Sequence, residues 1–86
     1  MSYVVSPDCV ACDVEGGVAI LNLKTNIYFG LDEVGTKVWG LLQEPASLSD
    51  LSHSVSSEFD VSQADCENDI SRLLDQMAQN GLVVRA

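Results

Sequence analysis

The order of the secondary structure is decided within residues 28–42, which read YFGLDEVGTKVWGLL. The stretch opens with an uncharged, aromatic run, a composition typical of a β-strand. Asp32 can then cap a helix, because apolar residues recur at i, i+4, i+7 and i+8 from Val34. These residues predict a strand over 26–31 that leads directly into a helix over 33–43.

Two more strands are predicted upstream, over 9–14 and 18–22. The first of these runs is short and β-prone, and it ends at residues 15–17, where two glycines can supply a positive φ. A second short turn, over 23–26, precedes the third strand. Three such runs joined by two short turns predict an antiparallel meander.

Two more helices are predicted downstream, over 48–59 and 63–80. Ser47 and Ser62 each precede a run with helical apolar periodicity, and each is followed by an aspartate three residues later. Residues 82–84 are expected to form a short extended tail. The sequence thus predicts an α+β domain in which one three-stranded antiparallel sheet is followed by three helices. Its core is expected to include Trp39, Leu41 and Leu42.

Composition and charge exclude several classes of protein. Eighty-six residues hold a single domain. Thirteen acidic residues against four scattered basic ones give a net charge of −9, whereas nucleic acids and anionic membranes bind clustered lysines and arginines. No apolar run approaches the roughly 18 residues that span a bilayer, and no secretory signal opens the chain, so a cytoplasmic location is expected. A basic peptide would be attracted to this surface.

Three cysteines and one histidine are the candidates for a thiol or imidazole metal site or for redox chemistry. Cys9 and Cys12 have Cys-x-x-Cys spacing, but residues three apart in a strand point to opposite faces. We expect reduced, buried or half-buried thiols at Cys9, Cys12 and Cys66, with a metal or redox pair as the alternative. His53 lies on a serine-rich helix face and is expected to be a solvated side chain. We therefore expect no catalytic residue, no metal and no cofactor.

The third strand is an outer strand of the predicted meander and carries neither charge nor proline. Outer strands present unpaired N–H and C=O groups, which natural proteins usually protect. Two interpretations stay open from the residues alone. Either the strand is an edge to which a partner strand can be added, or a helix covers it and its aromatic side chains belong to the core.

Residues 28–42 also resemble the signature of PqqD-like proteins, the precursor-peptide recognition elements of ribosomally made, modified peptides. The matching positions are Leu31-Asp32, Gly35, Val38-Trp39 and Leu41-Leu42. The similarity continues through the second and third helices, and within the family it is greatest to stand-alone members from lasso-peptide gene clusters. It implies a winged-helix-like domain in which a leader peptide adds a strand beside residues 26–31 and lies between that strand and the third helix.

The resemblance also implies which residues bind the leader. Main-chain groups of the third strand would bond to it, namely those of Asn26, Ile27, Tyr28, Phe29 and Gly30. The apolar stripe of the third helix would contribute side chains, namely Ile70, Leu73, Leu74 and Met77, although some of these must face the core. Asp69 flanks the stripe and is expected to contact a lysine or the backbone of the leader.

The function implied is that of a non-catalytic adaptor. It would capture the leader of a precursor peptide and present it to modifying enzymes, which in lasso systems are a leader peptidase and an ATP-dependent cyclase. We expect a monomer, with pairing of two copies through the same edge as the alternative. The second candidate function is a winged-helix regulatory or protein-interaction domain. Its DNA-binding form is disfavoured because the third helix carries one arginine against four acids.

Overall fold

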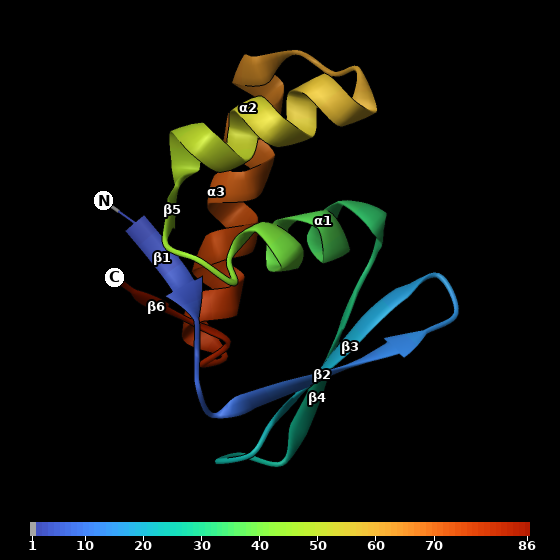
Figure 1. The fold of residues 1–86 in the computed structure, drawn as a ribbon, viewed down its shortest axis with the longest axis vertical. Helices are drawn as coiled ribbons and strands as arrows, with labels where there is room; N and C mark the ends of the chain where they lie inside the picture. The colour runs from blue at the N-terminus through green and yellow to red at the C-terminus, as the bar shows by residue number, and fades with distance from the viewer. Residues whose placement is uncertain (1) are drawn as a thin grey trace.

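The computed structural model describes residues 2–86. Along this part of the chain the strands are β1 (Ser2–Val5), β2 (Cys9–Val14), β3 (Gly17–Asn22), β4 (Ile27–Leu31), β5 (Ala46–Ser47) and β6 (Val83–Arg85), and the helices are α1 (Glu33–Leu41), α2 (Leu48–Phe59) and α3 (Gln63–Gln79). Figure 1 shows β2, β3 and β4 at one end of the molecule and α2 at the other, with α3 running between them.

The predicted antiparallel meander is present as the sheet β2-β3-β4. A turn at Glu15 and Gly16 joins β2 to β3 with Val14 opposite Gly17, and Gly16 has a φ of 86°. The strands lie within one residue of their predicted bounds. The difference at β4 is informative, because Asn26 has a φ of 59° and belongs to the turn rather than to the strand.

A second sheet, with strand order β5-β1-β6, was not expected. β1 pairs antiparallel with both neighbours, for example Tyr3 with Ala46 and Val4 with Val84. The expected extended tail is therefore part of a sheet. The α+β class is confirmed, but the likeness to a winged helix is loose. The two missed strands are too short, at four and two residues, to show the alternation by which strands are recognised.

The helices begin where the capping residues predict. The Asp32 side chain accepts a hydrogen bond from the Gly35 N–H at 2.9 Å, and Ser47 and Asp50 form a reciprocal capping box. α2 has its predicted bounds, whereas α1 ends two residues early and α3 one residue early. At α1 the cap is Leu42, whose N–H bonds to carbonyls of the last turn.

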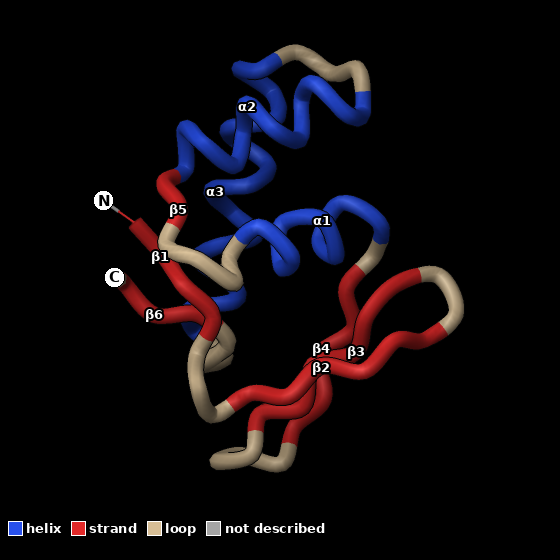
Figure 2. The backbone as a smooth tube through the Cα atoms, viewed as in Figure 1, coloured by secondary structure: helices blue, strands red, loops and turns tan. Residues whose placement is uncertain are grey.

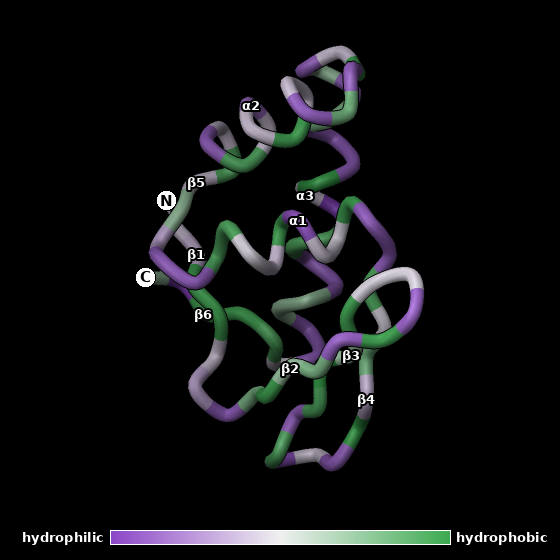
Figure 3. Tube along the Cα trace, turned by 45° about the vertical axis from the view of Figure 1, so that its right-hand side comes forward, coloured by the Kyte–Doolittle hydropathy of each residue, from purple (hydrophilic) through white to green (hydrophobic). Residues whose placement is uncertain are grey.

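The core is formed by buried residues of β3, β4, the three helices and the β6 segment. Figure 2 shows the helices on one side of the β2-β3-β4 sheet. Ile20 on β3 and Val38 on α1 are fully buried. Trp39 and Leu42 are also buried, as expected, while Leu41 is half-buried. Figure 3 shows apolar and polar residues alternating along α3, which buries one stripe and exposes the other. This packing places α3 near the sheet and leaves the outer edge of β4 without a paired strand among residues 2–86.

The first prediction concerns Gly17, where the hairpin, β4 and α1 meet. A Cβ at this position would overlap the backbone carbonyl oxygen of Leu31 and lie 3.1 Å from Thr36 Oγ1. Gly17→Ala should therefore lower the free energy of unfolding by about 1–3 kcal/mol. Gly40→Ala is the matched control, because nothing lies within 4 Å of its Cβ and alanine favours the helix by about 0.5–1 kcal/mol. Urea unfolding of both variants tests this, and equal stabilities would contradict it.

Candidate functional site

β4 is an edge strand, and the hydrogen-bond pattern of the sheet decides which of its groups are free. The Leu23 N–H donates to the Asp8 carbonyl at 2.9 Å, in register with the β2–β3 ladder. Residues of β3 at alternate positions from Leu23 therefore bond to β2. Since bonds in an antiparallel ladder alternate in direction, Val18, Ile20 and Asn22 bond to β4.

The partners of those three residues on β4 are Leu31, Phe29 and Ile27. Their main-chain groups consequently point inward to β3. The N–H and C=O groups of Tyr28 and Gly30 point the other way, where no strand is paired within residues 2–86. Of the five residues proposed to bond a peptide, these two have the outward geometry. Asn26 does not, because its N–H donates to the Asn22 carbonyl in the turn at 2.7 Å.

A groove runs between this edge and α3. Phe29 and Leu31, on the inner face of β4, line a hollow of about 270 Å³ together with Leu73 and Gln76 of α3. Phe29 is half-buried and Leu31 is buried. Tyr28 lies on the opposite face of the sheet and is 65% exposed. A strand added at this edge would thus lie beside an existing cleft with both polar and apolar surface.

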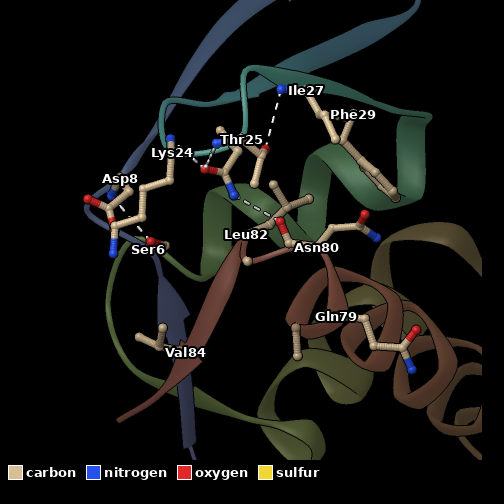
Figure 4. Close-up of a pocket in the computed structure, with 13 residues that line it drawn as sticks. Ser6, Asp8, Lys24, Thr25, Ile27, Phe29, Gln79, Asn80, Leu82 and Val84 are labelled. Carbon is tan, nitrogen blue, oxygen red and sulfur yellow. Dashed lines mark hydrogen bonds and ion pairs between the residues drawn. The ribbon is translucent and has the colours of Figure 1, made fainter.

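A second hollow, of about 510 Å³, lies between the β3–β4 turn, the end of α3 and the residues that flank β2 and β6 (Figure 4). Ile27 and Phe29 line it from the strand, and Ala78 and Gln79 line it from the end of α3. Leu82 and Val84 add apolar surface, while Asp8 and Lys24 form an ion pair of 3.2 Å at the rim. Phe29 lines both hollows.

Asn22 fixes the spacing of the two walls at this wider end. Its Nδ2 donates to the Asn80 carbonyl at 2.9 Å, and its Oδ1 accepts from the Lys24 N–H at 2.9 Å. The side chain is only 5% exposed. It therefore ties the β3–β4 turn to the last turn of α3. A Cβ at Gly81 would lie 2.8 Å from the same Nδ2, so the approach is close.

The α3 residues proposed from the sequence divide into two groups. Ile70, Leu74 and Met77 are 1%, 2% and 0% exposed and belong to the core, so their side chains do not line the groove. Leu73 is half-buried and lines the groove. Asp69 is exposed one turn before Leu73 and pairs with Arg72 at 3.1 Å. Periodicity alone could not separate these residues, because the buried face of α3 depends on where α2 and the sheet lie.

Three groove residues were missed by sequence reasoning. Asn22 occupies an inward-facing strand position, and a polar residue at such a position is itself a usable signal. Gln76 and Gln79 follow Leu73 at helical spacing, and both are exposed on the groove side of α3. Together with Leu73, they are exposed or half-buried α3 side chains that line the hollows, whereas Ile70, Leu74 and Met77 do not line them.

The cysteines lie outside the groove. All three are free thiols, and Cys9 and Cys12 lie on opposite faces of β2. Cys66 is buried and Cys9 half-buried, as expected, but the expected burial of Cys12 is wrong, because its side chain lies on the exposed face of the strand. Burial raises the pKa of the Cys9 thiol, a hydrogen bond with Ser6 opposes the rise and the Asp8 carboxylate adds to it. Burial and then Asp69 raise the pKa of Cys66. Among residues 2–86 no group of three histidine, cysteine or acidic side chains could hold a metal ion, and no helix there could cross a membrane.

Known proteins resemble this chain in sequence and in structure. Residues 17–83 match the sequence model of the family described as Coenzyme PQQ synthesis protein D (PqqD). TbiB1, solved in complex with the TbiA(beta) leader peptide, is 30% identical with a TM-score of 0.85 over 93% of each chain. Lasso peptide synthetase B1, solved in complex with a leader peptide, is 22% identical with a TM-score of 0.84 over 95% of this chain and 96% of that one. No curated protein sequence matches the chain.

The second prediction concerns Asn22. Asn22→Ala would leave the Asn80 carbonyl and the Lys24 N–H without their side-chain partner in a half-buried site. The free energy of unfolding should fall by about 1–3 kcal/mol. Asn68→Ala, an exposed position on α3, is the matched control and should change it by less than about 0.5 kcal/mol. Denaturant unfolding compares the two variants. If Asn22→Ala left the free energy of unfolding unchanged, the hydrogen bonds of the Asn22 side chain would contribute nothing to stability.

Proposed function

The chain belongs to the PqqD family, and from that premise we propose that it is a non-catalytic adaptor for a lasso-type precursor peptide. It binds the leader region and presents the attached core to modifying enzymes in the cytoplasm. The observation that carries this proposal is that the main-chain groups of Tyr28 and Gly30 point outward, next to a groove between β4 and α3. A relative of the same fold, TbiB1, binds a leader peptide, which supports it further.

Binding occurs by strand addition at β4. Tyr28 and Gly30 each offer one N–H and one C=O, and a peptide paired with both extends the sheet β2-β3-β4 by one strand. Each main-chain hydrogen bond contributes a net of about 0.5–1.5 kcal/mol. These bonds carry no sequence preference. Specificity comes instead from the peptide side chains that enter the groove between β4 and α3.

An adaptor of this kind needs only modest affinity. Holding the leader next to an enzyme raises the local concentration of the core, because the second encounter becomes intramolecular. The partner enzymes proposed are a leader peptidase and an ATP-dependent cyclase. The side chains described above form no nucleophile–base pair in the groove, so the chain contributes binding and the partners contribute the chemistry.

Charge argues against the winged-helix regulatory alternative. α3 is the element that would enter a DNA groove, and its exposed surface carries Asp65, Glu67, Asp69 and Asp75. Its one basic residue, Arg72, is paired with Asp69. Such a helix would repel phosphates and attract a basic peptide.

The third prediction tests strand addition through the direction of the main-chain bonds. Tyr28→Pro removes an outward donor and should abolish binding of the leader encoded by a neighbouring precursor gene. Tyr28→Ala keeps the donor and should retain most of the binding. Ala11→Pro is the matched control, because it removes an outward donor from the opposite edge strand, β2. Fluorescence anisotropy with labelled leader measures all three.

Phe29→Pro completes this series. The N–H of Phe29 bonds inward to β3, so this substitution should lower the unfolding temperature of the protein rather than affect leader binding alone. A folded Tyr28→Pro variant that binds the leader like the parent would overturn strand addition at this edge.

The fourth prediction separates apolar from ionic contributions. Leu73→Ala should weaken leader binding by about tenfold, because a buried leucine contributes about 1.5–3 kcal/mol and this one is already half-buried. Asp69→Asn should weaken it only a few-fold, because exposed ion pairs contribute about 0–1 kcal/mol. Raising the salt concentration should reproduce the smaller effect.

Titrations at two salt concentrations distinguish the contributions. Met77→Ala should instead destabilise the fold, since Met77 is fully buried. If a folded Leu73→Ala variant bound the leader like the parent, the groove beside Leu73 would not be part of the binding site. If Asp69→Asn weakened binding more than Leu73→Ala, the ionic contribution would exceed the apolar one, contrary to the prediction.

A further inference from the structure

β4 and α3, which flank the proposed path of the peptide, are held by different neighbours. β4 belongs to the β2-β3-β4 sheet, which packs mainly against α1, whereas α3 packs mainly against α2 and β6. A strand added to β4 would lie about 4.8 Å from it, so the space between β4 and α3 must have a suitable width. That width depends on the contacts that join the sheet directly to the end of the helix.

These contacts form a junction beside the hollow of about 510 Å³. It brings together the start of β2, the β3–β4 turn and the link from α3 to β6, which are far apart in the sequence. Asn22 Nδ2 donates to the Asn80 carbonyl at 2.9 Å, and the Cys9 thiol donates to the Gly81 carbonyl at 3.5 Å. A thiol is a weak donor, so the amide of Asn22 makes the stronger of the two links.

The Asn22 side chain serves both sides of this junction. Its Oδ1 accepts from the N–H groups of Lys24 and Thr25, at 2.9 and 3.4 Å, and these bonds shape the turn that leads into β4. Its own main chain pairs with Ile27, the first residue of the edge strand. The side chain is buried, so water competes little for its bonds. Asn22 therefore links the end of α3 to the point where β4 begins.

Gly81 permits the close approach of the two sides. It has a φ of 72°, in the left-handed region that favours glycine, and a Cβ there would lie 2.8 Å from Asn22 Nδ2. The backbone that follows α3 thus has no side chain at the point where the Asn22 amide meets it. The separation of β4 and α3 at this end is consequently set by contacts within the chain.

We propose that Asn22 is a positioning residue for strand addition. It holds the start of β4 and the end of α3 at the separation that an added strand requires, and it acts through Tyr28 and Gly30, whose main-chain groups bond to the peptide. The inference rests on the function proposed above. Without this link only a fraction of the molecules has the right separation, and a peptide binds only that fraction. Loss of the link therefore slows association, whereas loss of a direct contact speeds dissociation.

Asn22→Asp tests the positioning role, because it keeps the acceptor for the turn and removes the donor to Asn80. The probe is a fluorescently labelled leader peptide from the neighbouring precursor gene. Its association should slow about tenfold, and its dissociation rate should change by less than about twofold. Stopped-flow fluorescence measures both rates, under conditions in which circular dichroism shows that each variant is folded.

Val55→Ala is the matched control for a loss of stability alone. Val55 is buried on α2 and lines neither hollow, so the substitution lowers the unfolding temperature and should leave both rates like those of the parent. Parent-like association by folded Asn22→Asp would overturn the positioning role. Faster dissociation with unchanged association would also overturn it, because Asn22 would then contact the leader directly.

A measurement on the parent chain does not depend on how any variant folds. In nuclear magnetic resonance spectra, the side-chain amide protons of Asn22 should exchange with solvent more slowly than those of Asn68, which is exposed on α3. Equal exchange would show that the bond to Asn80 does not hold the junction, and it would overturn the proposal.

The outcomes separate this inference from the proposed function. A parent chain that binds no leader, or a folded Tyr28→Pro variant that binds it like the parent, contradicts the adaptor mechanism and the positioning role together. If leader binding requires the Tyr28 N–H but both rates are unchanged in Asn22→Asp, strand addition at β4 stands and only the positioning role is overturned.

Discussion

The alternation of hydrogen bonds across β2, β3 and β4 is the constraint on which the site depends. The two-residue turn at Glu15 and Gly16 sets the register of β2 on β3, and that register determines which residues of β3 remain to bond to β4. Every second residue of β4 is then committed to the sheet. Tyr28 and Gly30 are left as the outward pair, so the turn between β2 and β3 determines which main-chain groups of β4 are free to bond to a peptide.

A free edge becomes a site only because α3 lies beside it. Helix and edge are held together by the core residues of α3 and, at the wider end, by the bonds that Asn22 makes to the end of the helix. The buried stripe of α3 thus positions the groove without lining it. This division explains why Met77 and Leu73, four residues apart on one helix, have different roles although both are apolar.

The sequence predicts the local structure well because its signals are local. Asp32, Ser47 and Ser62 predict the starts of the helices, and short β-prone runs bounded by turn residues predict β2, β3 and β4 within one residue. The second sheet was not predicted from the sequence, because β1 pairs with β5 and β6, which lie far along the chain and are short. The face of α3 that lines the groove was not predicted for the same reason. It depends on how α3 packs against elements distant in sequence rather than on the helix itself.

An uncharged edge strand is normally a liability, because it can pair with another copy of the chain. Here the edge offers only two outward residues, and it ends at Asp32, which begins α1. The overhanging surface of α3 is acidic, and two chains of charge −9 repel each other. A single extended peptide brings no second acidic α3 to this edge. These features disfavour pairing with a second copy of the domain more than they disfavour the addition of one extended peptide.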